Sequence, residues 1–309
     1  MKLLVTGGAG YVGSVLVPHL LMQGHAVRVF DSLLYGGRGL LPCFAYPGFD
    51  FVKGSITDKD LLAHALAGVD AIIHLAAIVG YPSCKRNPRL AHEINFEGTR
   101  LLDQTRSRDQ PLLFASTGSN YGAVMGTLCT EDTPLNPLSE YGVTKTAAEH
   151  YLLDAGNVVC LRFATAFGVS NRMRFDLLIN DFVYQACINK DLIIYERGFK
   201  RTFIHVRDMA RAFAFALDNW AAIRDDVYNV GSEAMNYSKE DVALLIKKKV
   251  DYYLHFAEIG RDDDQRNYEV SYAKIRGKGF KTEVDIQTGI DELVKAADLL
   301  ARQNEFANV

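Results

Sequence analysis

The chain contains few cysteines and no long apolar run. Its five cysteines lie far apart, with no pair at the spacing of a metal-binding or redox motif: Cys43, Cys84, Cys129, Cys160 and Cys187. We therefore expect buried thiols in a reducing compartment, which predicts a cytoplasmic protein. No apolar segment is long enough to span a bilayer, and residues 1–6 lead into a glycine loop without the features of a signal peptide. This pattern predicts no membrane partner.

The chain also lacks an excess of charge of one sign. Its 34 basic and 37 acidic side chains give a formal net charge of -3, so no overall basic surface is available for nucleic acid or an anionic membrane. His74 and His205 stand at strand-like positions with no further ligands at metal spacing, and we expect both to be satisfied core or cleft histidines. The sequence predicts neither a nucleic-acid partner nor a metal site.

No Pro/Gly/Ser-rich linker, repeat or low-complexity tract divides the 309 residues. With 49% hydrophobic residues the chain can bury a large core. We expect two parts that pack together with a ligand cleft between them. Residues 1–165 are predicted to bind a dinucleotide, and residues 166–309 to form mostly a substrate-binding cap, with some segments returning to the first part.

Short apolar runs alternate with helical patterns in the first half of the chain. Runs rich in Val, Ile, Leu and Phe predict strands at residues 2–6, 26–30, 50–52, 71–74, 112–115 and 158–162. Helices are predicted at 11–23, 58–66, 88–107 and 140–153, the last capped by Ser139. Later residues predict short strands near Leu192 and Val227 and helices at 207–219 and 239–249. The alternation predicts an α/β fold with a Rossmann-like, doubly wound parallel sheet.

A glycine loop follows the first predicted strand and opens the first predicted helix. It reads Gly7-Gly8-Ala9-Gly10-Tyr11-Val12-Gly13, and its spaced glycines are Gly7, Gly10 and Gly13. Glycine permits a tight turn and lets backbone N–H groups approach a pyrophosphate, whose charge the helix N-terminus favours. The alternative, a glycine-rich turn that only joins strand to helix, is disfavoured by this context.

Asp31 ends the second predicted strand. A carboxylate there can accept hydrogen bonds from a ribose 2′-hydroxyl and repel a 2′-phosphate, which favours NAD over NADP. The alternative is that Asp31 only caps a turn before Ser32.

Tyr141 and Lys145 are four residues apart on one predicted helix, so their side chains share a face. An adjacent ammonium and a cationic nicotinamide would favour the phenolate of Tyr141, which could then remove a hydroxyl proton. The same spacing occurs at Tyr81 and Lys85, but Pro82 between them predicts a loop rather than a helical face.

Hydroxyl side chains follow the fifth predicted strand, at the edge where open α/β sheets bind ligands. The segment reads Phe114-Ala115-Ser116-Thr117-Gly118-Ser119-Asn120-Tyr121-Gly122. We expect Thr117 to be the catalytic hydroxyl, with Ser116 as the alternative.

These motifs together resemble the extended short-chain dehydrogenase/reductases over nearly the whole chain. The resemblance is carried by the glycine loop, the Ser-Thr segment, His74-Leu75-Ala76-Ala77, Tyr141-Gly142-Val143-Thr144-Lys145 and Arg201-Thr202-Phe203-Ile204-His205-Val206. Within them the chain is similar to the NAD-dependent nucleotide-sugar epimerases and dehydratases, whose catalytic Ser or Thr lies four residues before a Tyr-Gly pair, which here selects Thr117. The run from Arg172 to Phe182, with Lys85-Arg86-Asn87-Pro88, resembles bacterial GDP-heptose 4-dehydrogenases most.

The resemblance also implies binding residues. Further contacts to NAD are implied for Ile56, Asp58, Leu75, Ala76 and Ala77. Contacts to the sugar nucleotide are implied for Thr117, Gly118, Ser119, Thr165, Asn180, Arg201 and Arg266, the two arginines holding the diphosphate. The helices at 88–107 and 140–153 resemble the family's dimer helices, which implies a homodimer.

Several positions depart from the family pattern. Dehydrating members carry a carboxylic acid just after the catalytic hydroxyl, where this chain has Gly118 and Ser119, so a 4,6-dehydratase is disfavoured. Thr165 replaces an asparagine that contacts the substrate in many relatives, and Gly54-Ser55 lacks the aspartate that contacts adenine. Sugar and adenine contacts are therefore expected to differ.

The sequence thus predicts an NAD-dependent enzyme that oxidises a nucleotide-linked sugar at C4. Thr117 would orient the hydroxyl, Tyr141 would take its proton, and Lys145 would lower the tyrosine pKa and hold the nicotinamide ribose. If the keto sugar leaves, the enzyme is a dehydrogenase, with a GDP-heptose or related substrate. If the keto sugar turns over and hydride returns to its other face, the enzyme is a 4-epimerase. A non-catalytic NAD-binding regulatory protein is the remaining alternative.

Overall fold

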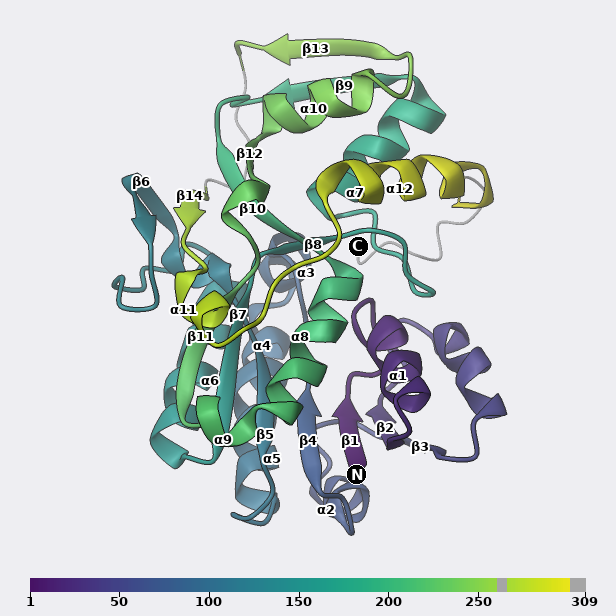
Figure 1. The fold of residues 1–309 in the computed structure, drawn as a ribbon, viewed down its shortest axis with the longest axis vertical. Coiled ribbons are helices and arrows are strands. Elements are labelled where there is room, and N and C mark those ends of the chain that lie inside the picture. The colour runs from purple at the N-terminus through teal and green to yellow at the C-terminus, as the bar shows by residue number, and fades with distance from the viewer. Residues whose placement is uncertain (260–265, 301–309) are drawn as a thin grey trace.

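A seven-stranded parallel sheet forms the centre of the computed structural model, which describes residues 1–259 and 266–300 (Figure 1). The strand order is β11-β7-β5-β4-β1-β2-β3. The strands are β1 (Lys2–Thr6), β2 (Ala26–Asp31), β3 (Phe49–Lys53), β4 (Ala71–His74), β5 (Leu112–Thr117), β7 (Val158–Phe163) and β11 (Asp226–Val230). Six of them are the predicted strands, and the seventh, β11, is the strand expected near Val227. The predicted Rossmann-like sheet is confirmed.

Helices cover both faces of this sheet because successive strand residues point to opposite sides. Leu3 and Val5 of β1 pack with Phe213 in one buried cluster, on the face covered by α1 (Gly13–Met22) and α8 (Val206–Asp218). Leu4 packs with Leu102 and Leu152 in another cluster, on the face covered by α2 (Lys59–Leu66), α5 (Gly98–Thr105) and α6 (Glu140–Ala155). Because the strands are parallel and both faces of the sheet are covered, the carboxyl ends of the strands form one open edge of the sheet.

The predicted helix at 88–107 is helical but not uniform. It consists of α4 (Pro88–His92), a π-helical turn η2 (Glu93–Glu97) and α5. Asn87 begins it by accepting a hydrogen bond from Leu90 N at 3.1 Å. Asparagine is a favoured N-cap, and proline is tolerated at the first helical position because the N–H there has no partner within the helix.

The prediction of a loop at Tyr81 and Lys85 is wrong. These residues belong to α3 (Tyr81–Arg86), a short helix that packs against α6. Pro82 lies in the first turn, where it removes no intrahelical hydrogen bond. The Lys85 ammonium lies 5.1 Å from the centre of the Tyr81 ring, so the two side chains do share a face.

A second group of elements lies beyond the carboxyl ends of the sheet (Figure 1). It contains β9 (Asp191–Tyr195) paired in parallel with β13 (Tyr253–Ala257), and the helices α7 (Leu178–Tyr184), η4 (Gln185–Asn189), α10 (Lys239–Lys247) and α12 (Ile286–Leu300). Phe182, Leu192, Val242 and Ile290 belong to its own buried cluster. This group faces the sheet edge where ligands are expected.

Smaller elements connect the two groups. A three-stranded sheet, β8 (Thr165–Phe167), β10 (Lys200–His205) and β12 (Asn236–Ser238), lies between them. The remaining elements are η1 (Arg38–Ala45), η3 (Gly118–Tyr121), β6 (Ala123–Cys129), α9 (Trp220–Ile223), η5 (Glu233–Met235), β14 (Asn267–Val270) and α11 (Ala273–Gly277). β14 pairs with β6, a contact across more than a hundred residues that no local pattern predicts.

Within the described residues, no helix combines the length and apolar character that crossing a bilayer requires. The five cysteines are free thiols, and four are buried, whereas Cys187 is half-buried.

Candidate active site

A cavity of about 1050 Å³ opens at the carboxyl ends of β1, β2, β4 and β5. Its wall on one side comes from the glycine loop and α6, and on the other from α7, β9 and β10. Ligand pockets for a single drug-sized molecule measure roughly 300–1,000 Å³. At about 1050 Å³ the cavity lies just above this range, and it extends from the glycine loop on one side to α7 and β9 on the other.

At its glycines the glycine loop lines the cavity with backbone alone. Gly7 has a φ of 70°, and a Cβ placed on it would lie 2.6 Å from Ala76 N. A Cβ on Gly13 would lie 2.5 Å from the Cα of Gly8, where the loop turns into α1. Neither position accepts a larger residue, and the bare backbone before the N-terminus of α1 matches the site that a pyrophosphate requires.

Asp31 lines the cavity beside this loop, at the end of β2. Its Oδ2 accepts from Ala9 N at 3.0 Å and its Oδ1 from Leu33 N at 2.7 Å, so the carboxylate does cap a turn as well. Burial raises the pKa of Asp31, opposed by these two backbone hydrogen bonds. Each oxygen keeps a further acceptor site, so the fixed carboxylate can also receive ribose hydroxyls.

Most residues with an implied role in NAD binding line the cavity, with one exception. Tyr11, Val12, Ile56, Leu75, Ala76 and Ala77 do so, together with Gly7, Gly10 and Gly13. Asp58 does not: its Oδ1 accepts from Leu61 N at 3.1 Å and caps α2. The aspartate in this loop therefore begins a helix, and its contact with the cofactor stays a prediction.

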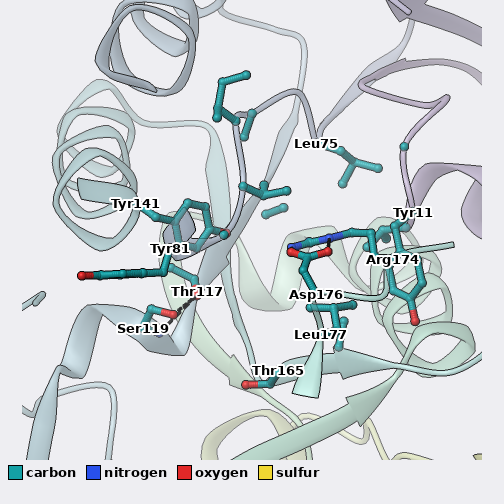
Figure 2. Close-up of a pocket in the computed structure, with 18 of the residues that line it drawn as sticks. Tyr11, Leu75, Tyr81, Thr117, Ser119, Tyr141, Thr165, Arg174, Asp176 and Leu177 are labelled. Carbon is teal, nitrogen blue, oxygen red and sulfur yellow. Dashed lines mark hydrogen bonds and ion pairs between the residues drawn. The ribbon is translucent and has the colours of Figure 1, made fainter. Parts of the chain in front are cut away.

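The three residues predicted to be catalytic all line the cavity, and Figure 2 shows Thr117 and Tyr141 on one wall. Ser139 accepts from Gly142 N at 3.1 Å and so begins α6, which carries Tyr141 and Lys145. Thr117 ends β5, near enough to the Tyr141 phenol to lower its pKa. Thr117 Oγ1 also donates to Ser119 Oγ at 3.1 Å. The arrangement places a hydroxyl beside the phenol that would move a proton.

The pKa of Tyr141 follows from burial and nearby charge. Burial raises it to about 12, while the charges of Arg174 and Arg266 and the hydrogen bond with Thr117 lower it. Burial also lowers the pKa of Lys145 to about 7, and its Nζ lies 3.8 Å from the centre of the Phe114 ring. The cations that lower the pKa of Tyr141 in this structure are thus arginines, and the Lys145 amine, with a pKa of about 7, carries only part of a charge at neutral pH.

Ser116, the alternative catalytic hydroxyl, is used elsewhere. Its Oγ donates to Glu149 Oε2 at 2.5 Å, and Glu149 forms a buried ion pair with Arg162 at 2.6 Å. Asn120 Nδ2 donates to the same hydroxyl at 3.3 Å. This network ties α6 to β5 and β7 beneath the site, and it leaves Thr117 as the better placed hydroxyl.

The residues predicted to bind the sugar nucleotide divide into two groups. Ser119, Thr165, Arg201 and Arg266 line the cavity with Thr117, whereas Gly118 and Asn180 do not. Asn180 is buried, and its amide accepts from Gly168 N at 2.9 Å and donates to Tyr11 Oη at 3.2 Å and Arg174 O at 2.9 Å. In this structure Asn180 holds the loop after β8, and its contact with the substrate stays a prediction.

The two arginines predicted to hold the diphosphate lie differently. Arg201 is buried on β10 and donates to Lys200 O at 3.0 Å. Arg266 donates to Ser119 Oγ at 2.5 Å, which brings its charge close to Thr117 and Tyr141.

Sequence reasoning missed an ion pair inside the cavity. Arg174 and Asp176 both line it and bond at 2.6 Å, with side chains only 12% and 10% exposed (Figure 2). Arg172 lies nearby, with its guanidinium 4.5 Å from the centre of the Tyr35 ring. Arg172 and Arg174 belong to the run from Arg172 to Phe182 that resembles the GDP-heptose 4-dehydrogenases. The spacing of residues in that run does not show that its loop enters a cavity.

The two histidines at strand-like positions are buried. The ring of His74 bonds to Thr6 Oγ1 at 2.7 Å and Thr99 Oγ1 at 2.9 Å, and burial lowers its pKa to about 3. His205 lies 3.4 Å from Glu292, and burial lowers its pKa to about 4. Both rings are therefore neutral at pH 7 and sit among structural contacts.

Comparison with known proteins gives one consistent family. Residues 3–231 match the NAD dependent epimerase/dehydratase family. A dTDP-glucose 4,6-dehydratase of Actinoplanes is 31% identical, covering 95% of this chain and 97% of that protein. A UDP-glucose 4-epimerase of Corynebacterium glutamicum is 29% identical, covering 80% of each chain. The crystal structure of a Thermus thermophilus UDP-glucose 4-epimerase with NAD superposes with a TM-score of 0.83, at 27% identity, 96% of this chain and 99% of that one.

The described residues fit the cofactor of these enzymes. Gly7, Gly10 and Gly13 bring bare backbone to the cavity before the N-terminus of α1, and Asp31 stands beside them with free acceptor capacity. The curated relatives and the solved structure are enzymes acting on nucleotide sugars by name. The chain is thus an enzyme of the NAD-dependent epimerase/dehydratase family, and its cofactor is NAD.

Proposed function

We propose that the chain oxidises a nucleotide-linked sugar at C4 and then reduces the keto sugar from its other face, as a 4-epimerase. The observation that carries this proposal is that Thr117 and Tyr141 line the same cavity as the glycine loop and Asp31. The names of the epimerases among its relatives support the same outcome.

In this mechanism Thr117 receives the sugar hydroxyl and Tyr141 moves its proton. The O–H bond of the C4 hydroxyl breaks, its proton passes to the phenolate of Tyr141, and the same proton returns when the ketone is reduced. Bound NAD supplies the acceptor for the hydride from C4 and, once reduced, its donor. Arg174 and Arg266 assist by favouring the phenolate, against the burial that raises the pKa of Tyr141 to about 12.

The cavity is poorly equipped for dehydration. The residues after Thr117 are Gly118 and Ser119, and neither is a strong acid or base at pH 7. The carboxylates among the described lining residues are Asp31, Asp176 and Asp181. Asp31 is beside the glycine loop, Asp176 is paired with Arg174, and Asp181 stands on α7 in the second group of elements. None of the three follows the catalytic hydroxyl, the position where the resemblance places the acid for loss of water.

Arg201 and Arg266 are proposed to receive the diphosphate of the substrate. Both line the cavity between the sheet edge and the α7–β9 side, and guanidinium groups bind phosphate oxygens through paired donors. The homodimer predicted from the helices at 88–107 and 140–153 remains a further proposal.

The test is mass spectrometry of UDP-, dTDP- and GDP-linked hexoses and heptoses after incubation with NAD and the enzyme. A 4-epimerase gives an isomer of unchanged mass that chromatography separates. Tyr141→Phe is expected to abolish turnover and keep NAD binding, whereas Tyr253→Phe, at an exposed residue on β13, is expected to change neither. Full activity of Tyr141→Phe would overturn the mechanism.

The same experiment distinguishes the second candidate, a 4-dehydrogenase acting on a GDP-heptose or related sugar. This candidate uses the same three residues and is supported by the run from Arg172 to Phe182, which brings Arg174 and Asp176 into the cavity. Its product would lack two hydrogen atoms and would form together with an equal amount of NADH. A product that has lost water would contradict both candidates.

A further inference from the structure

One buried carboxylate in the cavity has no part in the proposed hydride chemistry. Asp181 lies on α7 and lines the cavity. Gln185 Nε2, one turn later, donates to its Oδ1 at 3.2 Å. Burial raises its pKa to about 6, with Gln185 opposing and the charge of Asp176 adding to the rise. A carboxylate kept partly desolvated at a ligand cavity is costly to the fold, which makes it a candidate for ligand recognition.

Asp181 belongs to the end of the cavity away from the catalytic wall. Thr117 ends β5 of the large sheet and Tyr141 lies in the first turn of α6, which covers that sheet. In contrast, α7 lies with β9 and α10 in the second group of elements, beyond β8 and β10 (Figure 1). Arg201, on β10, lines the cavity between these two ends. A substrate whose sugar lies at Thr117 and whose diphosphate lies at Arg201 therefore extends its nucleoside toward α7.

The surroundings of Asp181 suit a flat, mostly apolar ring. Phe182, Ile193, Ile194 and Tyr195 line the cavity at this end. Lys239 Nζ donates to Tyr195 O at 3.1 Å and so holds the end of β9 in place. Apolar side chains with a single well-placed polar group are the usual composition of a base-binding pocket.

We propose that Asp181 accepts two neighbouring N–H donors of a guanine base, at N1 and at the exocyclic N2, so that the substrate is a guanine-nucleotide sugar. This inference rests on the proposed function. An ionised carboxylate has only acceptors and binds two adjacent donors best. Uracil and thymine offer one N–H between two carbonyl oxygens, which the carboxylate repels. Adenine and cytosine offer one amino group beside an acceptor nitrogen.

The experiment is calorimetric titration of the NAD-loaded enzyme with GDP, UDP and dTDP. Three proteins are compared: the natural chain, Asp181→Asn, and Asp191→Asn as a control at an exposed aspartate that begins β9 and does not line the cavity. We expect GDP to bind about tenfold or more tightly than UDP and dTDP, which is the discrimination typical of one paired base contact. Asp181→Asn is expected to remove this preference by weakening GDP alone, and Asp191→Asn to keep it.

The outcomes separate this inference from the proposed function. Equal binding of the three diphosphates, or a preference for GDP that survives in a folded Asp181→Asn protein, would overturn the role of Asp181 and leave the C4 chemistry standing. An Asp181-dependent preference for GDP in a protein that converts no nucleotide sugar would uphold the base contact and refute the proposed reaction. Circular dichroism of each variant shows whether its fold is intact.

Discussion

The buried lysine of the catalytic wall is expected to make the stability of the NAD-free protein depend on pH. Burial lowers the pKa of Lys145 to about 7 from an ordinary value of 10.5. Between these two values the unfolded chain binds a proton that the folded chain does not, so the free energy of unfolding rises with pH across this window. Below pH 7 both states are protonated and the full penalty of burying the charge applies.

The magnitude follows from the size of the shift. A difference of 10.5 - 7 = 3.5 pKa units corresponds to a penalty of about 5 kcal/mol at low pH, at 1.36 kcal/mol per unit. By pH 9 the penalty falls to about 2 kcal/mol, because only the interval between pH 9 and the unfolded pKa still contributes. The stability gain between pH 6 and pH 9 from this one group is therefore about 3 kcal/mol.

The perturbation that isolates this effect is Lys145→Met, which keeps a similar volume and removes the titration. Urea unfolding of both proteins, free of dinucleotide and in reductant, is measured from pH 6 to pH 9. The advantage of Lys145→Met over the natural chain is expected to shrink by about 3 kcal/mol as the pH rises. Lys248→Met, at an exposed lysine, serves as the control and is expected to give a flat difference. A flat difference for Lys145→Met as well would show that the lysine stays charged, which refutes the reasoning.

Three further substitutions test the site and its support. Gly7→Ala is expected to abolish NAD binding, measured by fluorescence titration, because φ at this position is 70° and the new Cβ would lie 2.6 Å from Ala76 N. Tight binding of NAD by this variant would contradict the assigned role of the loop. Asp31→Asn is expected to weaken the binding of NAD and to reduce the ratio of the NAD and NADP affinities about tenfold, since one charge that repels a 2′-phosphate is removed. Unchanged affinities for both dinucleotides would show that Asp31 only caps its turn. Glu149→Gln is expected to lower the free energy of unfolding by about 3–5 kcal/mol, because it leaves the guanidinium of Arg162 buried without its ion partner; a loss below about 1 kcal/mol, the value for exposed ion pairs, would show that the pair is effectively solvated.

The sheet and the cofactor loop could be predicted from the sequence because both depend on local patterns. Strands such as β4 are short apolar runs between turn signals, and the glycines of the loop are required by contacts within a single strand–turn–helix unit. The catalytic helix was also predictable, since Ser139 marks its start and fixes which residues share a face.

What the sequence did not show depends on long-range contacts. Asp58 was assigned to NAD, but whether a loop aspartate binds a ligand or caps the next helix depends on where the loop lies. Asn180 was placed in the substrate site because its neighbours fit a pattern, while its amide is used up by groups that adjoin it only in the folded chain. Tyr81 was discounted because of Pro82, although a proline in the first turn does not prevent a helix.

The path of β10 into α8 limits how this fold can be rearranged. β10 carries Arg201 on the substrate side and ends at His205, and α8 begins at the next residue and packs against α1, directly behind the glycine loop. The chain returns once more to the large sheet as β11 before it enters α10. A recombined enzyme that borrows its substrate half from a relative therefore cannot be made with a single junction, and every graft must carry α8 or rebuild its packing on α1. New specificity is more accessible through point changes within the cavity than through exchange of whole parts.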